Sequence, residues 1–325
     1  MTGDDGSPRL CLVLGAPRSG TTWLQRLLAV SPHVASPQES NLFGGYLAPQ
    51  QRAWRADVER LEHAVATAGD ERRVIGLPTL LEERDLLDAQ RLLVERFLAR
   101  ALATKPSAEL VVEKTPAHSL CVDVVDRVCP AARFVHIVRD PRDVMASLRD
   151  AAAGWGRGWA PADPVAAARL WRRHVEGARQ AAALGPDRYH QLRYEDLRAD
   201  PVGTLAHVRT FLGLPDDPRA LVDAEAGAAP AATFAFEPRL HRRMEALGVG
   251  EPDGFRGGGR APLDRRWRRA AEIVLGPTAR ELGYTSGWDE VSRRARRLWV
   301  PPLYAAHGLD GARRRWRRGG EARGW

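Results

Sequence analysis

The stretch from Gly15 to Trp23, Gly-Ala-Pro-Arg-Ser-Gly-Thr-Thr-Trp, has the residue types best suited to hold an anion. It lies between an apolar run at 9–14 and a segment at 21–30 whose apolar residues recur at helical spacing. Glycines let the backbone approach an anion, successive N–H groups point into the turn, and the following helix N-terminus adds about half a positive charge. These residues therefore predict a phosphate-binding loop between a strand and a helix.

Two kinds of phosphate loop fit the glycine spacing of this stretch. A Walker loop would need a lysine where Thr21 stands, and the positive charge lies instead at Arg18, inside the turn. A P-loop kinase that uses ATP with magnesium, with Thr22 and Asp140 as metal ligands, is therefore one alternative. The missing lysine argues against it.

The other kind of loop belongs to a known family. The segment from Pro17 to Trp23 resembles the 5′-phosphosulfate loop of sulfotransferases that use 3′-phosphoadenosine 5′-phosphosulfate (PAPS), P-[KR]-S-G-T-[ST]-[WL], and matches it without a gap. The resemblance implies that this loop holds the phosphosulfate and that its tryptophan stacks on adenine, since an aromatic ring suits a flat base. The cofactor-binding residues implied here are Arg18, Ser19, Gly20, Thr21, Thr22 and Trp23.

A second match lies after the apolar run at 133–138. The family has an arginine at the end of a core strand and a serine eight residues later, and here these are Arg139 and Ser147. A dianionic phosphate suits a guanidinium at a strand end and a hydroxyl on the next helix, so the resemblance implies that both bind the 3′-phosphate. A surface ion pair of Arg139 with Asp140 or Asp143 is the plainer alternative.

Further matches extend the resemblance to residues 9–284. Leu-Arg-Tyr-Glu-Asp-Leu at 192–197 is similar to a family segment whose tyrosine, here Tyr194, lies against adenine. The late family loop that closes on the 3′-phosphate normally carries a tryptophan. Here that region has arginines and glycines without the tryptophan, and Arg256 and Arg260 are the phosphate ligands that it offers.

Two residues compete for the role of the base that takes the proton of an acceptor hydroxyl. Glu39 resembles the glutamate base of sulfotransferases with a tyrosylprotein-like or glycan-like pattern. His118 lies two positions later than the histidine base of the cytosolic small-molecule enzymes, because Pro116 holds that place. The pattern favours Glu39 and leaves His118 as the alternative. Lys114, with Arg18, is expected to stabilise the transferring group, and the reaction needs no metal.

Apolar runs predict the strands that must position these residues, at 9–14, 109–112, 133–138 and 189–194. Helical spacing predicts helices at 21–30, 52–68, 86–104, 119–128, 141–150, 164–184, 201–213 and 262–282. Alternating strands and helices call for a parallel sheet covered on both faces, with ligands at the carboxyl ends of the strands. The predicted fold class is α/β, a P-loop-like three-layer fold with a central parallel sheet flanked by helices.

Composition limits the class of protein. The chain has 325 residues, 44% hydrophobic and 28% charged, which excludes a disordered, collagen-like or coiled-coil chain. No apolar run approaches the roughly 18 residues of a membrane span, and the acidic start is unlike a signal peptide. Cys11, Cys121 and Cys129 lack a CxxC spacing, so we expect neither a disulfide framework nor a zinc site, and a cytoplasmic location.

The positive charge gathers at one end of the chain. Residues 291–325 contain ten arginines against Asp310 and Glu321, which accounts for the whole net charge of +8. We therefore expect a sulfotransferase domain at 1–286 and a basic C-terminal extension at 287–325 with an anionic partner. A non-enzymatic polyanion binder acting through this extension is the second alternative function.

Overall fold

The computed structural model describes residues 9–66, 76–227 and 262–284. These residues form two compact units. The first comprises the described residues up to Val138 and those from His174 to 227, and the second comprises Arg139–Arg173 with 262–284. The boundary expected between residues 286 and 287 lies outside the described residues, so it stays a prediction.

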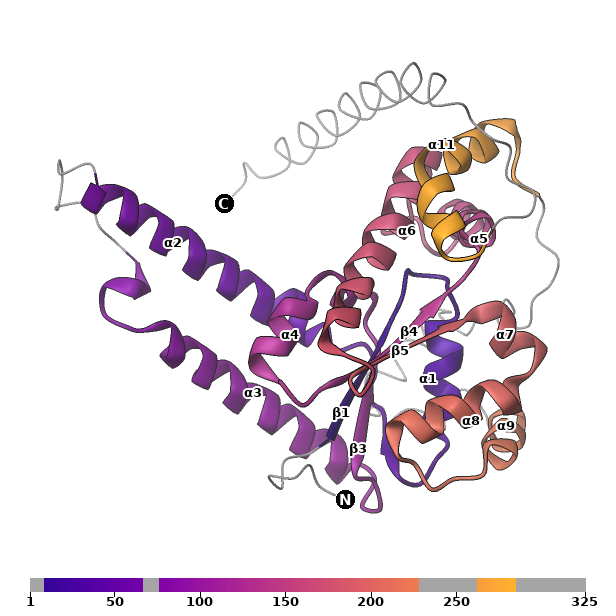
Figure 1. Ribbon diagram of the computed structural model, residues 1–325, viewed down its shortest axis with the longest axis horizontal. Helices are drawn as coiled ribbons and strands as arrows, with labels where there is room; N and C mark the ends of the chain where they lie inside the picture. Colours follow the sequence, from indigo (N-terminus) through magenta and orange to yellow (C-terminus); the bar gives the residue numbers. More distant parts are fainter. Residues whose placement is uncertain (1–8, 67–75, 228–261, 285–325) are drawn as a thin grey trace. The chain divides into compact units, whose positions relative to one another are not determined.

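A five-stranded parallel sheet is the centre of the first unit, with the order β2-β3-β1-β4-β5. Figure 1 labels four of these strands, β1, β3, β4 and β5. The strands are β1 (Arg9–Leu14), β2 (Val34–Ala35), β3 (Leu110–Glu113), β4 (Arg133–Val138) and β5 (Tyr189–Arg193). Four of them lie within one residue of the predicted runs. The two-residue β2 has no apolar run long enough to be recognised, and it is a strand only because it pairs with β3.

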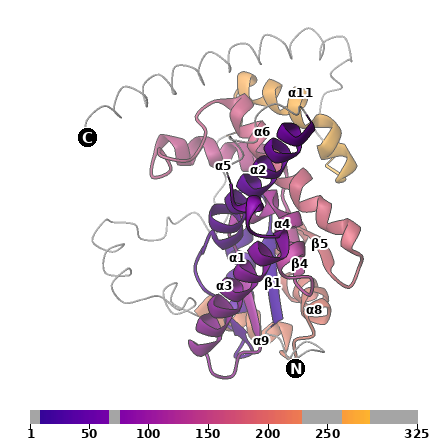
Figure 2. The same cartoon turned by 90° about the vertical axis from the view of Figure 1, so that its left-hand side faces the viewer.

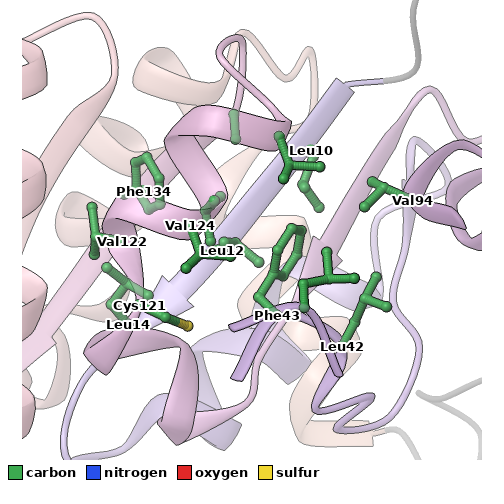
Figure 3. Close-up of a cluster of buried hydrophobic side chains, with 14 of the residues drawn as sticks. Leu10, Leu12, Leu14, Leu42, Phe43, Val94, Cys121, Val122, Val124 and Phe134 are labelled. Atoms are coloured by element: carbon green, nitrogen blue, oxygen red, sulfur yellow. The ribbon is translucent and has the colours of Figure 1, made fainter. Parts of the chain in front are cut away.

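The side chains of β1 alternate between two hydrophobic clusters, as the period of a strand requires. Leu10, Leu12 and Leu14 enter one cluster together with apolar residues of α3 (Glu83–Ala103) and α4 (Val122–Val128), as Figure 3 shows. Cys11 and Val13 enter the other, with α1 (Thr21–Ala29), α7 (Tyr194–Ala199), α8 (Pro201–Leu212) and α9 (Pro218–Gly227). Helices thus cover both faces of the sheet, which confirms the predicted α/β class with a central parallel sheet.

The remaining helical segments of this unit are α2 (Ala48–Ala66) and short helical turns at Leu42–Leu47, Leu77–Thr79, Pro116–Leu120 and Gln180–Leu184. Gln51 of α2 donates a hydrogen bond of 2.8 Å to Gln90 of α3, and both side chains are buried. Figure 2 shows α2 and α3 in front of the strands, on the side that α4 also covers. The expected helix at 119–128 is divided at Cys121 into a short turn and α4.

The second unit is helical. It contains α5 (Pro141–Ala153), the first part of α6 (Pro164–Arg179) and α11 (Arg265–Glu281), and α5 packs on α11. Pro141 is the first residue of α5, where a missing N–H costs nothing, and the Asp140 carboxylate caps the helix by accepting the N–H of Arg142 at 2.8 Å. Asp264 caps α11 in the same way, through the N–H of Trp267.

Candidate functional site

The loop at residues 15–23, called the donor loop below, is a tight turn between β1 and α1. Gly20 has a φ of 90° in the left-handed region, and a Cβ there would lie 2.4 Å from the Tyr194 ring, so only glycine fits. Arg18 also has a positive φ, 72°, which is strained for a residue with a side chain. The N–H of Ser19 closes the turn on the carbonyl of Ala16 at 3.1 Å.

The donor loop offers hydrogen-bond donors where an anion would bind. Gly20 begins α1 without a capping side chain, so the first N–H groups of the helix have no partner within the helix. The Ser19 side chain is fully buried, and its hydroxyl has no hydrogen-bond partner among the described residues. A buried hydroxyl usually has a partner, so this orphaned group and the uncapped helix fit a bound phosphate or sulfate.

The structure brings together the two aromatic residues predicted to contact adenine. The Trp23 and Tyr194 rings stand edge to face, with centroids 5.9 Å apart and planes at 69°. Tyr194 is buried beneath Gly20, whereas Trp23 on the first turn of α1 is partly exposed. Tyr194 therefore also supports the donor loop from below, which the sequence did not indicate.

Glu39 and Lys114 form an ion pair at the carboxyl end of β3. The Lys114 side chain is 5% exposed and the Glu39 side chain is 52% exposed. The ammonium therefore reaches the pair from the interior, while the carboxylate is open to an incoming molecule. The two residues that were singled out separately from the sequence lie in direct contact.

Glu113, the last residue of β3, organises this end of the sheet although the sequence analysis did not single it out. Its buried carboxylate accepts hydrogen bonds at Oε1 from the N–H of Ser40 at 2.9 Å, the hydroxyl of Ser40 at 2.8 Å and the hydroxyl of Thr115 at 2.7 Å. Burial opposes ionisation, but His118 and these donors outweigh it and lower the pKa of Glu113 below its ordinary value. The sequence signal was an acidic residue at the end of a buried strand.

His118 lies inside the protein and not at its surface. Its Nδ1 is 2.7 Å from Oε2 of Glu113, and its Nε2 accepts the backbone N–H of Phe43 at 3.2 Å. The imidazole is 1% exposed, and both ring nitrogens have protein neighbours. This placement gives His118 no open nitrogen with which to meet an acceptor, unlike Glu39.

The predicted 3′-phosphate residues belong to the second unit. Arg139 lies two residues before the start of α5, and its side chain is 11% exposed. Its Nη2 lies 3.4 Å from a carboxylate oxygen of Asp143, which is the ion pair that was considered as the alternative. Ser147 is buried on α5. The indole of Trp171 donates to the backbone carbonyl of Arg139 at 3.1 Å and helps to fix the residue. Arg256 and Arg260 lie outside the described residues.

The kinase alternative gains nothing from the structure. Thr21 occupies the Walker-lysine position at the start of α1, and the carboxylate of Asp140, the metal ligand which that alternative needs, is held by the backbone and guanidinium of Arg142. No group of three or more His, Cys, Asp or Glu residues within 9–66, 76–227 and 262–284 could hold a metal ion. Across the same described ranges, no helix has the length and apolar character to cross a membrane.

Comparisons of the sequence with known proteins find sulfotransferases. The model of the sulfotransferase family matches residues 11–218. Over 116 residues, 33% of this chain and 29% of the relative, the sequence is 34% identical to an omega-hydroxy-beta-dihydromenaquinone-9 sulfotransferase of Mycobacterium tuberculosis. It is 28% identical over 189 residues, 50% of this chain and 44% of the relative, to carbohydrate sulfotransferase 5 of Mus musculus. The chain thus spans less than half the length of these curated relatives.

Solved structures similar to this chain include a sulfotransferase domain from the curacin biosynthetic pathway. It has 22% sequence identity and a TM-score of 0.48, over 86% of this chain and 98% of that chain. A sulfotransferase domain from an olefin synthase of Synechococcus PCC 7002 has 22% identity and a TM-score of 0.47, over 84% of this chain and 96% of that chain.

Proposed function

The chain belongs to the sulfotransferase family, and on that basis we propose that it transfers the sulfuryl group of PAPS to a hydroxyl acceptor. The observation that carries this proposal is the donor loop, whose sequence follows the family pattern and whose buried Ser19 hydroxyl and uncapped helix N-terminus present unpaired donors to an anion. The residues present fit a bound phosphosulfate.

The proposed roles combine the resemblance to the family with the positions of the described residues. Arg18, Ser19, Gly20, Thr21 and Thr22 would hold the 5′-phosphosulfate, and Trp23 with Tyr194 would contact adenine. Arg139 and Ser147, with Arg256 and Arg260 of the late loop, would bind the 3′-phosphate. Bound PAPS supplies the sulfuryl group, whose bond to the 5′-phosphate breaks as a bond to the acceptor oxygen forms.

Glu39 is the base in this proposal, and it receives the proton of the acceptor hydroxyl at its exposed carboxylate. Lys114 holds that carboxylate in place and, with Arg18, supplies positive charge for the group in transfer. No resident metal is part of the proposed reaction.

The acceptor, the location and the partner belong to the same proposal. The acceptor is a hydroxyl of a small molecule, a lipid or a glycan. A cytoplasmic location is supported by Cys11, Cys121 and Cys129, which are free thiols, as is usual in a reducing compartment. The basic residues at 287–325 would serve an anionic partner.

A ligand-stability screen tests the proposed donor. We expect 3′-phosphoadenosine 5′-phosphate (PAP) to raise the melting temperature without magnesium, because a ligand that binds only the folded state stabilises it. Arg139→Ala should remove most of the shift. Stabilisation by ATP with magnesium and none by PAP would replace the proposal with the kinase alternative.

Substitution of the base tests the proposed chemistry. Glu39→Gln should leave the PAP-induced shift unchanged and lower turnover by about 10², the usual scale for a lost general base. Turnover is measured as PAP released from PAPS with 4-nitrophenol, 1-octanol or N-acetylglucosamine as the acceptor. Wild-type turnover of Glu39→Gln would refute the role of Glu39.

A further inference from the structure

Residues 37–43, called the base loop below, donate hydrogen bonds from three backbone N–H groups to side chains of residues 113–118. Ser40 N–H donates to the carboxylate of Glu113, Asn41 N–H to the hydroxyl of Thr115 at 3.1 Å, and Phe43 N–H to the ring of His118 at 3.2 Å. The two segments are more than 70 residues apart in the sequence. The conformation of the base loop is thus imposed from outside the loop.

Glu113 links these contacts to one another. Its two carboxylate oxygens meet Ser40 twice, the hydroxyl of Thr115 and Nδ1 of His118, so it orients both side chains that hold the loop farther along. Because Glu113 is fully buried and Glu39 is half exposed, this carboxylate does not itself meet an acceptor. Its influence passes to Glu39 through the neighbouring residue, Ser40.

The same segment also reaches the donor loop. The hydroxyl of Ser119 accepts the N–H of Gly15 at 3.0 Å and lies 3.3 Å from the Gly15 carbonyl, and all of these groups are buried. Residues 113–119 therefore contact the loop that carries the proposed base and the loop that carries the proposed donor site. A displacement of this segment would change the position of one relative to the other.

We propose that Glu113 is a positioning residue for sulfuryl transfer. It fixes Glu39 through Ser40, Thr115 and His118, and His118 serves as the acceptor of the Phe43 N–H and not as the base. The inference rests on the proposed function only in taking Glu39 as the base. Pre-organised geometry of this kind matters because a reacting group displaced by about 1 Å can cost a hundredfold in rate.

Kinetics separate positioning from a merely structural role. Glu113→Gln replaces one carboxylate oxygen, a hydrogen-bond acceptor, with an amide NH2 group that can only donate. We therefore expect kcat to fall at least about tenfold, while the KM for PAPS and the PAP-induced shift stay within about twofold. Glu109→Gln is the matched control, because it removes a partly exposed glutamate four positions earlier and should leave both constants unchanged. A parallel loss of PAP binding in Glu113→Gln would overturn the proposal.

Rescue by a second substitution at His118 distinguishes a hydrogen-bond acceptor from a catalytic base. His118→Leu should lower kcat about tenfold, and His118→Gln should recover most of it, since an amide oxygen can accept the Phe43 N–H. A general base at this position would leave the glutamine variant as impaired as the leucine variant. Equal loss in the two variants would therefore overturn the role given to His118.

A double-mutant cycle tests whether Glu113 acts through Glu39. The double variant Glu39→Gln, Glu113→Gln should turn over no more slowly than Glu39→Gln alone, because the base that Glu113 positions is already absent. If the double variant lost turnover by the product of the two single losses, the proposal would be overturned. If Glu39→Gln itself has wild-type turnover, the proposed function fails at its base, which is a different result. Ser40→Ala, which removes one of the contacts, gives the same comparison if Glu113 variants fold poorly.

Discussion

The donor loop and the base loop lie in the same unit but are built in different ways. The donor loop takes most of its shape from local features, namely glycine backbone angles, one short hydrogen-bonded turn and the helix that follows, although Ser119 and Tyr194 also contact it. The base loop has its N–H groups held by side chains 73 to 75 positions away. A motif in consecutive residues is therefore enough to recognise the first, whereas the second depends on which strands become neighbours.

We expect the largest effect from a substitution that disrupts the backbone conformation of the donor loop. Gly20→Val places a side chain at a φ of 90° and against the ring of Tyr194, so we expect the PAP-induced rise in melting temperature to vanish. Gly185→Val is the matched control, since Gly185 has a φ of 92°, has open space around it and is not part of the donor loop. A normal PAP shift in Gly20→Val would show that the loop tolerates another backbone.

The chain has two lysines, Lys105 and Lys114, and we expect one to be structural and the other catalytic. Lys105 Nζ donates to the carbonyls of Ala29, Ser31 and Val34 at 2.5 to 3.1 Å and so joins the end of α1 to β2. Lys105→Met should lower the free energy of unfolding by about 3 kcal/mol, because hydrogen bonds from a charged group are lost. Turnover per folded molecule should not change.

Lys114→Met should behave in the opposite way, with turnover reduced and stability little altered, because its partner Glu39 is half exposed. Urea denaturation and PAPS turnover, measured on both variants, separate the two roles. If Lys105→Met lost turnover in a fully folded protein, the division between a structural and a catalytic lysine would be wrong.

The local structure of the donor loop could be predicted almost completely from the sequence. Arg18 to Trp23 lie as the strand, glycine turn and helix pattern predicts, and β1 and β4 have the predicted bounds. Periodicity and turn chemistry are local properties, so they can be recognised without knowing the partner of each strand.

The base side could be predicted only as separate candidates. Glu39, Lys114 and His118 were singled out, but their contacts depend on β3 lying between β1 and β2, which no local pattern states. Glu113 was missed because an acidic residue in a buried strand has no meaning until its hydrogen-bond donors arrive from the base loop. For the same reason, the burial of His118 could not be foreseen.

The buried histidine His136 of the first unit gives a smaller effect that depends on pH. Nδ1 of His136 lies 2.8 Å from the hydroxyl of Tyr189, and burial, helped by Arg179, lowers the pKa of His136 from 6.5 to about 3. Below pH 6.5 the unfolded chain binds a proton that the folded chain refuses until about pH 3, so stability falls as the pH falls.

The slope is about 1.4 kcal/mol per pH unit, so His136 should cost about 2 kcal/mol of unfolding free energy between pH 6.5 and pH 5. Urea denaturation of the wild type and of His136→Phe over this range measures the difference. The variant should show a shallower pH dependence, and equal slopes would mean that His136 is protonated in the folded protein.

A still smaller effect is expected at Trp23, the donor-loop residue whose ring is proposed to contact the adenine of the donor. An aromatic contact is worth about 1 kcal/mol, so Trp23→Leu should weaken PAP binding about fivefold and Trp23→Phe much less. Trp23 also touches Tyr194, however, so the substitution could act by loosening the loop. Ribose 3,5-bisphosphate, which has both phosphates and no base, separates the two explanations by calorimetry. If Trp23 stacks on adenine, Trp23→Leu weakens PAP binding and leaves binding of the baseless ligand unchanged, whereas equal weakening of both ligands would show that Trp23 only supports the loop.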